Sequence, residues 1–169
     1  AQTLASDAAN GEGFGNLTIN NTSGTPTVQL TTPIDVQGSI LISAGTLDAD
    51  DGGGPYQINV AGNWTNNGGF VSGTGLVVFD GTVDQTLTSG GTGAGQDFAN
   101  LRHSGSANLI LATNALRVTT QLTVDAGATL QLAGNALDLT GAILRNATGA
   151  VIEPRGTENI TIGTIDSDS

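Results

Sequence analysis

The chain has 169 residues, enough for one domain, of which only 4 % are aromatic and 11 % charged. Four Arg stand against fifteen Asp and Glu, Lys is absent, and the formal net charge is −11. A surface of this sign repels phosphate backbones, which argues against nucleic-acid binding, and no apolar stretch is long enough for membrane insertion as a helix. Because Cys is absent, a disulfide framework and a Cys-ligated metal are excluded.

The predicted elements are short β-strands along the whole chain, and no segment has a helical pattern. Apolar side chains alternate at period two, as in strands that bury one face. Turns such as Asp51-Gly52-Gly53-Gly54 and Ser89-Gly90-Gly91 separate the alternating pairs. In chain order, the predicted inward pairs are Leu17/Ile19, Val28/Leu30, Ile34/Val36, Ile40/Ile42, Ile58/Val60, Leu76/Val78, Leu109/Leu111, Leu116/Val118, Leu122/Val124, Leu130/Leu132, Leu137/Leu139 and Ile160/Ile162.

The spacing of these pairs favours a solenoid over a sandwich or barrel. Pairs in the second half begin about six to nine residues apart, whereas sandwich strands follow one another at roughly 8–12 residues and prefer more aromatic bulk in the core. A parallel β-helix with three strands per coil uses roughly 21–24 residues per coil. The sequence therefore predicts an all-β fold, a parallel β-helix solenoid of about seven to eight coils.

The second half of the chain also echoes the first at an offset of about 83 residues. A fixed period is typical of repeat proteins, whose units bury their apolar faces by stacking on one another. We predict one solenoid domain over residues 13–162, made of two tandem repeats of nearly four coils each, with tails at 1–12 and 163–169. The clearest echoes are Phe14-Gly15-Asn16-Leu17 with Phe98-Ala99-Asn100-Leu101, Ile34-Asp35-Val36 with Leu116-Arg117-Val118, and Thr46-Leu47 with Thr129-Leu130.

Several Gly-, Asn- and Thr-rich strings resemble the β-helical repeats of large secreted bacterial surface proteins, the adhesins and autotransporter passengers. The resemblance covers most of residues 13–162, and it implies a right-handed β-helix at the cell surface without implying a ligand. The strings are Gly15-Asn16-Leu17-Thr18-Ile19, Gly45-Thr46-Leu47-Asp48, Gly62-Asn63-Trp64-Thr65-Asn66-Asn67-Gly68, Gly73-Thr74-Gly75-Leu76-Val77-Val78-Phe79-Asp80-Gly81, Gln85-Thr86-Leu87 and Phe98-Ala99-Asn100-Leu101.

The start of the chain gives a separate expectation about location. It reads Ala1-Gln2-Thr3, as a chain does after signal-peptide removal behind a small residue. We therefore expect an extracellular or cell-surface protein.

The ends of a solenoid expose unpaired strand edges and apolar side chains unless caps cover them. Neither tail has the pattern of a helical cap. In the account that we prefer, copies stack head to tail into a homopolymer, with Leu4 as one anchor and Ile160, Ile162 and Ile165 at the other end. In the alternative, the chain is an adhesin or glycan-binding module of a larger surface protein.

Candidate sites for chemistry are few. Asp48, Asp50 and Asp51 form the densest carboxylate group, which predicts either a solvated turn or a weak calcium site, although the spacing lacks the alternate ligands of an EF-hand loop. Arg117 and the other three Arg are not set beside paired carboxylates in the sequence, so we expect no enzyme activity and no cofactor besides the calcium.

Three ring side chains complete the candidates. Trp64 and Tyr56 are weak candidates for stacking on a sugar, although a single Trp among strands more commonly packs at a corner or under a loop. His103 has no Cys or second His to join it at a metal, and we expect it on the surface or in a turn.

Overall fold

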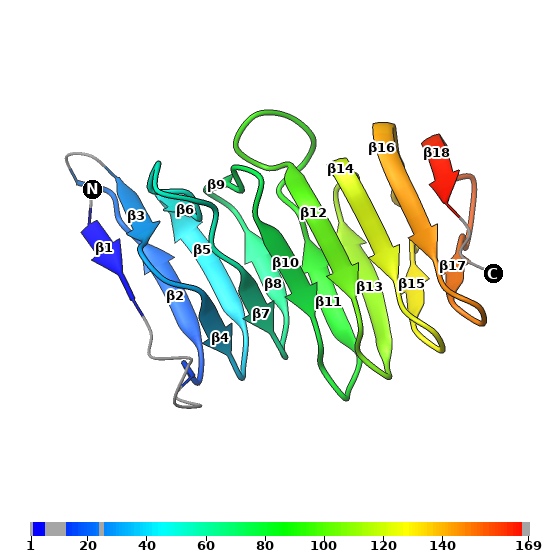
Figure 1. The fold of residues 1–169 in the computed structure, drawn as a ribbon, viewed down its shortest axis with the longest axis horizontal. Helices are drawn as coiled ribbons and strands as arrows, with labels where there is room; N and C mark the ends of the chain where they lie inside the picture. Colours follow the sequence, from blue (N-terminus) through cyan, green and yellow to red (C-terminus); the bar gives the residue numbers. More distant parts are fainter. Residues whose placement is uncertain (1, 6–12, 24–25, 167–169) are drawn as a thin grey trace.

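The computed structural model describes residues 2–5, 13–23 and 26–166 of the chain. Within these ranges every regular element is a β-strand, and the strands stack into a rod with the first coil at one end and the last coil at the other (Figure 1). All pairs between strands are parallel. The predicted all-β parallel solenoid is therefore confirmed, with about seven coils.

Three sheets form the faces of the rod, and the chain visits them in the order first, second, third. The first face contains β1 (Gln2–Leu4), β3 (Thr27–Leu30), β6 (Thr46–Asp48) and β9 (Gly69–Val71). The second face contains β4 (Ile34–Val36), β7 (Ile58–Val60), β10 (Leu76–Phe79), β12 (Phe98–His103), β14 (Leu116–Val124), β16 (Leu137–Asn146) and β18 (Ile160–Asp166). The third face contains β2 (Leu17–Asn20), β5 (Ile40–Ala44), β8 (Trp64–Asn66), β11 (Gln85–Thr88), β13 (Asn108–Thr113), β15 (Thr129–Gln131) and β17 (Val151–Glu153).

After β9 the first face is built in a different way. Residues 95–98 take the next position on it, because the Phe70 amide donates to the Gly95 carbonyl at 2.6 Å and Phe98 pairs with Val118 of β14. From β14 onward, the first and second faces of each coil belong to one long strand that bends where its register shifts. Each of β14, β16 and β18 thus has a first leg on the first face and a second leg on the second face.

Coil length explains where the 83-residue echo falls. One coil takes between 19 residues, from Ile58 to its partner Val77, and 26 residues, from Gln2 to its partner Val28. The two similar segments of each pair are separated by three coils and two further faces. They therefore lie on different faces of the rod. Each repeat therefore spans three and two-thirds coils, close to the four expected, but its echoed segments fall on different faces. The faces change from third to second for Leu17 and Leu101, from second to first for Ile34 and Leu116, and from first to third for Thr46 and Thr129.

The interior consists of columns of inward Leu, Ile and Val side chains that run along the rod. Near the middle of the rod four aromatic rings replace them. The ring centroid of Trp64 lies 4.9 Å from that of Phe70, 6.4 Å from Phe79 and 5.4 Å from Phe98. Such inclined ring pairs stabilise by about 0.5–1.5 kcal/mol each beyond the area they bury. Four of the six aromatic residues of this chain are therefore concentrated at one place in the core.

Strand β10 has the opposite phase to the one predicted. Val77 and Phe79 are in register with the buried residues of β7 and point inward, whereas Leu76 and Val78 lie on the outward side. All four residues of this strand are apolar, so alternation alone carries no phase information. The larger ring of Phe79 takes the interior position beside Trp64.

Polar side chains tie successive coils together at the corner before the third face. Asn16 Oδ1 accepts a hydrogen bond from the Ser39 amide at 2.7 Å, and Ser39 Oγ accepts one from the Asn63 amide at 3.0 Å. Asn63 Oδ1 then accepts one from the Thr86 amide at 2.7 Å. This chain of contacts satisfies backbone donors that the turn leaves without a strand partner.

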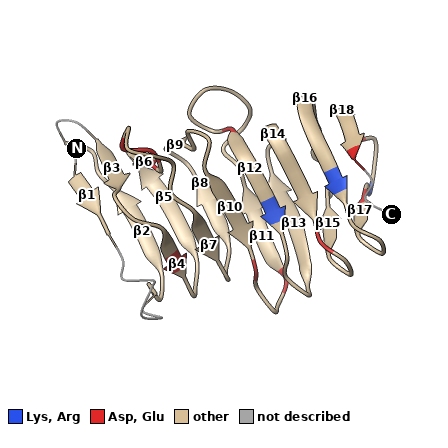
Figure 2. Ribbon diagram, viewed as in Figure 1, with Lys and Arg blue, Asp and Glu red and all other residues tan. Residues whose placement is uncertain are grey.

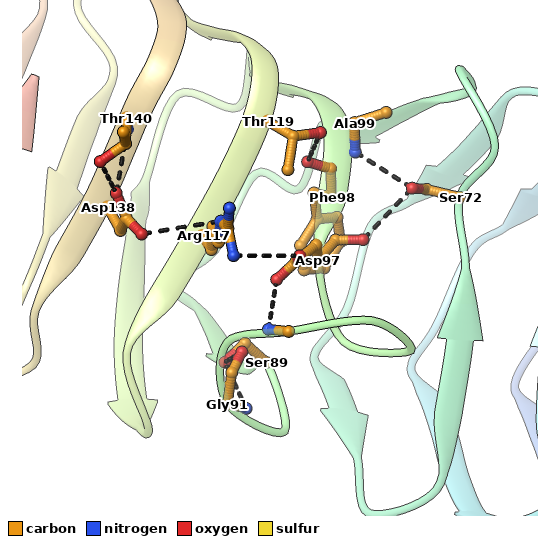
Figure 3. A network of polar contacts seen from close by, with 11 residues as sticks. Ser72, Ser89, Gly91, Asp97, Phe98, Ala99, Arg117, Thr119, Asp138 and Thr140 are labelled. Atoms are coloured by element: carbon orange, nitrogen blue, oxygen red, sulfur yellow. Dashed lines mark hydrogen bonds and ion pairs between the residues drawn. The ribbon is translucent and has the colours of Figure 1, made fainter. Parts of the chain in front are cut away.

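The Gly-rich turn 89–97 forms the large loop beside β12 (Figure 1). Asp97 holds its base: the carboxylate accepts from the Gly93 amide at 2.7 Å and lies 3.8 Å from Arg117 Nη1. Arg117 Nε lies 3.6 Å from a carboxylate oxygen of Asp138 in the following coil (Figure 3). One guanidinium group therefore links three consecutive coils on the outside of the rod.

Candidate functional site

The last coil leaves inward side chains uncovered. Ile160, Ile162 and Ile165 of β18 are in register with leucines of β16 that are at most 5 % exposed, yet the isoleucines are 37, 40 and 60 % exposed. They continue core columns and face solvent only because no described residue forms a further coil over them. The exposure is therefore a property of this end of the rod and not of an outward strand face.

The same end has unpaired strand edges. Strand β18 is the end strand of the second face, and β17 is the end strand of the third. An end strand presents backbone N–H and C=O groups that have no neighbouring strand to pair with. Unpaired backbone groups beside apolar side chains are the two features that strand addition uses in protein recognition.

The first coil is better covered than the last. Leu17 and Ile19 of β2 are only 8 and 4 % exposed, and Leu4 and Phe14 are partly buried against the core. Leu4 lies in β1, which pairs with β3 of its own chain. The predicted anchor is thus used within the molecule, and among the described strands this end offers the far edges of β1 and β2 to a neighbour.

Both predicted tails contribute strands to the solenoid. Residues 2–4 form β1 on the first face, and residues 163–166 belong to β18. The remaining tail positions, residues 1, 6–12 and 167–169, lie outside the described residues. The solenoid is therefore longer at both ends than the range 13–162 predicted from the sequence.

Charge is distributed unevenly along the rod. Residues 1–101 contain nine Asp and Glu and no Arg or Lys, whereas residues 102–169 contain six Asp and Glu and all four Arg. The formal charges of the two parts are therefore −9 and −2, which together give −11. In Figure 2 the blue segments of the viewed face lie on β12 and β16, in the second half. The two ends of the rod consequently differ in electrostatic character.

The three aspartates predicted as a calcium site do not converge on a common point. Each accepts a hydrogen bond from the amide two residues ahead: Asp48 from Asp50 at 3.0 Å, Asp50 from Gly52 at 2.9 Å and Asp51 from Gly53 at 2.7 Å. These are Asx turns, which stabilise a loop locally. The described part of the chain contains no group of three His, Cys, Asp or Glu placed to hold a metal. The geometry agrees with a solvated turn and gives no support for calcium.

The two aromatic candidates for sugar stacking both pack against other parts of the protein. Trp64 is fully buried in the aromatic cluster and has no exposed face on which a sugar could stack. Tyr56 is partly buried against the core, and its hydroxyl donates to Asp51 at 3.1 Å. That hydrogen bond to a carboxylate raises the pKa of Tyr56. Tyr56 therefore anchors the acidic turn.

His103 is buried, so the prediction of a surface histidine is wrong. Its Nε2 lies 3.0 Å from the Ala107 carbonyl and its Nδ1 lies 3.4 Å from the Phe79 carbonyl. Both neighbours are acceptors, and a neutral imidazole donates from one nitrogen only, so the shorter contact favours a proton on Nε2. The sequence did contain a signal for this burial: His103 lies two residues after Leu101, so the period-two alternation of the strand places both side chains inward.

Comparisons with known proteins place the chain in no family: no family model, no curated protein and no solved structure matches it. The resemblance to bacterial surface β-helices therefore stays a prediction from short strings. The described residues also include no helix that is long and apolar enough to cross a membrane. The surface at the C-terminal end of the rod is accordingly the candidate site with the strongest physical support.

Proposed function

We propose that this protein is a non-enzymatic structural element of the extracellular space that assembles end to end, the last coil of one copy pairing with the first coil of the next. The observation that carries this proposal is the exposure of Ile160, Ile162 and Ile165 in core columns, which only another coil would cover. Full burial of one isoleucine stabilises by about 1.5–3 kcal/mol. Covering three partly buried ones therefore contributes a few kcal/mol, in addition to the strand hydrogen bonds. The extracellular location follows from the resemblance to secreted proteins.

The charge distribution supports a head-to-tail contact over a contact between two N-terminal ends. A contact between two N-terminal ends brings together two halves that carry −9 each. A head-to-tail contact brings the −9 half of one copy against the −2 half of another, which lowers the repulsion. A head-to-tail contact joins two different surfaces and does not close on itself, so it produces a filament.

The test is the association of the 169-residue chain in solution. Negative-stain microscopy is expected to show rods one solenoid wide, and sedimentation velocity is expected to show species that grow with concentration. The variant Ile162→Lys places a charge in the end surface and is expected to abolish both. Its matched control is Val83→Lys, because Val83 is an apolar side chain that is 69 % exposed away from β18. A strictly monomeric wild type at high concentration, or a dimer that never grows, would contradict the proposal.

A second candidate function is a module of a larger surface protein, in which further coils of the same polypeptide cover β18. One observation favours it: Arg–Asp pairs link coils in the second half, as Arg117 with Asp138 and Arg145 with Asp166 do. Residues 1–101 contain no Arg or Lys that could face Asp166 from the next copy. In this case the 169-residue chain stays monomeric, and Ile162→Lys changes its unfolding but not its association.

A further inference from the structure

The outward side of the second face carries a shallow track in the C-terminal half of the rod. One groove has a volume of about 290 Å³, and an adjoining hollow has a volume of about 180 Å³. The two share Thr123 and Arg145, so together they form one track that crosses the strands along the rod axis. The groove is lined by Leu76, Arg102, Gln121, Thr123, Asp125 and Arg145, and the hollow by Thr123, Arg145, Asn146, Ala147 and Asp166.

Strand register places the polar groups of this track in a row. Arg102 of β12, Thr123 of β14 and Arg145 of β16 are direct partners on successive strands. Because parallel strands lie about 4.7–4.9 Å apart, the two arginine backbones are separated by roughly 9.5 Å along the axis. Figure 2 shows a blue segment on β12 and another on β16, on the same side of the rod. An extended ligand lying along the axis would therefore meet both of them.

The charges in the track cancel. Arg102 binds the carboxylate of Asp125 through Nε and Nη2 at 2.7–3.1 Å, and Arg145 Nη2 lies 3.2 Å from Asp166. Two guanidinium groups and two carboxylates give no net charge. All four side chains are nevertheless partly exposed, at 27–49 %. The track consequently offers both strong donors and strong acceptors to a ligand without attracting a particular sign of charge.

The side chains between the two arginines also offer both hydrogen-bond donors and hydrogen-bond acceptors. Gln121 Nε2 donates to Thr123 Oγ1 at 2.9 Å. This bond leaves the Gln121 carbonyl as an acceptor and the Thr123 hydroxyl hydrogen as a donor. Leu76 adds an apolar patch at one end of the groove. Alternating donors and acceptors with a small apolar patch match the chemistry of a sugar, whose hydroxyl groups both donate and accept and whose ring has C–H surfaces.

We propose that this track binds a segment of an uncharged polysaccharide laid along the rod axis. A polyanion is disfavoured because the track has no net charge and the whole chain carries −11. The proposal does not rest on end-to-end assembly, since the track faces outward from the side of the rod and meets the last coil only at Asp166 of β18. It also replaces Trp64 as the carbohydrate contact, because that ring is buried.

The test is a titration of the isotope-labelled 169-residue chain, followed by NMR, with dextran oligosaccharides and cello-oligosaccharides as neutral probes and polygalacturonate as the acidic probe. At least one neutral probe is expected to shift the amides of residues 102, 123 and 145 at millimolar concentration, with little dependence on salt. Arg145→Ala is expected to weaken that binding by about tenfold or more, since it removes charge-assisted hydrogen bonds. Arg155→Ala is the matched control, because Arg155 is also exposed and ion-paired but lies outside the track.

Three results would overturn the proposal: no shift with any neutral probe, binding of polygalacturonate alone with a steep salt dependence, or equal loss in Arg145→Ala and Arg155→Ala. Circular dichroism of both variants checks that they fold. Repeating the titration in Ile162→Lys separates the two proposals, because an unchanged affinity is expected even where end-to-end association is lost.

Discussion

The two halves of the rod make the same three-faced coil by different means. In the first half each face has its own short strand, and glycine allows the corners of successive coils to touch. In the second half one bent strand such as β14 or β16 serves two faces, and Arg–Asp pairs cross the outer surface. The aromatic cluster lies where the two constructions meet, between β8 and β12.

The column of inward side chains, and not the corner, therefore defines the coil. Leu, Ile and Val continue in register across the change of construction, as in the pairing of Val77 with Ile58 on one side and with Leu101 on the other. Corners only have to bring the chain from one inward column to the next. They therefore tolerate a bend, a turn or a nine-residue loop such as 89–97.

The largest expected effect compares how much the aromatic cluster and the aliphatic columns each contribute to the free energy of unfolding. Trp64→Ala is expected to lower the free energy of unfolding by about 3–5 kcal/mol, since it leaves a cavity and removes three ring contacts. Leu122→Ala, in the aliphatic half, is the matched comparison and is expected to cost less. Urea denaturation followed by circular dichroism measures both. A smaller loss for Trp64→Ala than for Leu122→Ala would mean that the cluster is not the better-packed region.

The next effect compares a corner where successive coils touch, at Gly62, with a corner that has open space around it, at Gly127. A Cβ atom on Gly62 would lie 2.5 Å from the Gly38 carbonyl carbon of the preceding coil, so Gly62→Ala forces coils apart and is expected to cost about 1–3 kcal/mol. Gly127, at φ 77°, has no atom within 4 Å of such a Cβ, so Gly127→Ala costs only the left-handed backbone strain of about 1 kcal/mol.

A rescue separates these two causes of destabilisation. Asn tolerates the left-handed conformation, so Gly127→Asn is expected to recover much of the stability lost in Gly127→Ala. Gly62→Asn is expected to be at least as damaging as Gly62→Ala, because the obstacle there is backbone of the neighbouring coil. Thermal unfolding of the four variants measures this, and equal rescue at both positions would show that the corners do not differ.

A smaller effect concerns acidic groups in the two halves. Burial, with the nearby charge of Asp35, raises the pKa of Asp80, whereas hydrogen bonds from Thr140, with the charge of Arg117, lower the pKa of Asp138. Asp80 therefore favours the folded state most below its unfolded pKa and loses that contribution as the pH rises through its folded pKa. Asp138 contributes above its unfolded pKa and loses its contribution as the pH falls through its folded pKa.

These opposite signs can be measured directly. At neutral pH, Asp80→Asn is expected to be neutral or slightly stabilising and Asp138→Asn slightly destabilising, each by no more than about 1 kcal/mol because both side chains are only partly buried and solvent screens their charges. Both differences are expected to disappear as the carboxyl groups become protonated. Carboxyl carbon NMR titrations give the two pKa values, and shifts of the same sign would remove the contrast.

The smallest expected effect is that of the outer ion pairs in the second half. Arg117→Gln is expected to lower the free energy of unfolding by less than about 1 kcal/mol at low salt, and by less still at high salt, because the pairs with Asp97 and Asp138 are partly exposed. Hydrogen exchange is the sharper measurement, since loss of the link is expected to speed exchange of the Gly93 amide. No change there would show that Asp97 holds the loop by itself.

Much of the fold was predictable because period-two alternation identifies strands wherever polar residues interrupt it. Eleven of the twelve predicted inward pairs lie in or beside strands with the expected phase, and Leu76/Val78 fails because β10 has no polar residue to set the phase. Among the site residues, sequence indicated Ile160, Ile162 and Ile165 from their position at the end of a periodic chain. The track around Arg102 and Arg145 was not predictable, because its residues come from strands whose register is not written in the sequence.

The sequence predicted a parallel solenoid, since short alternating strands, small residues and closely spaced turns favour that fold over a sandwich or a barrel. The three-dimensional packing was needed to show which faces the echoed segments occupy, that Trp64 and His103 lie in the core, and that two ion-paired arginines share one row. The physical reason is that alternation specifies inside against outside within a strand. Coil length and corner geometry, which accumulate over many turns, specify which strands become neighbours.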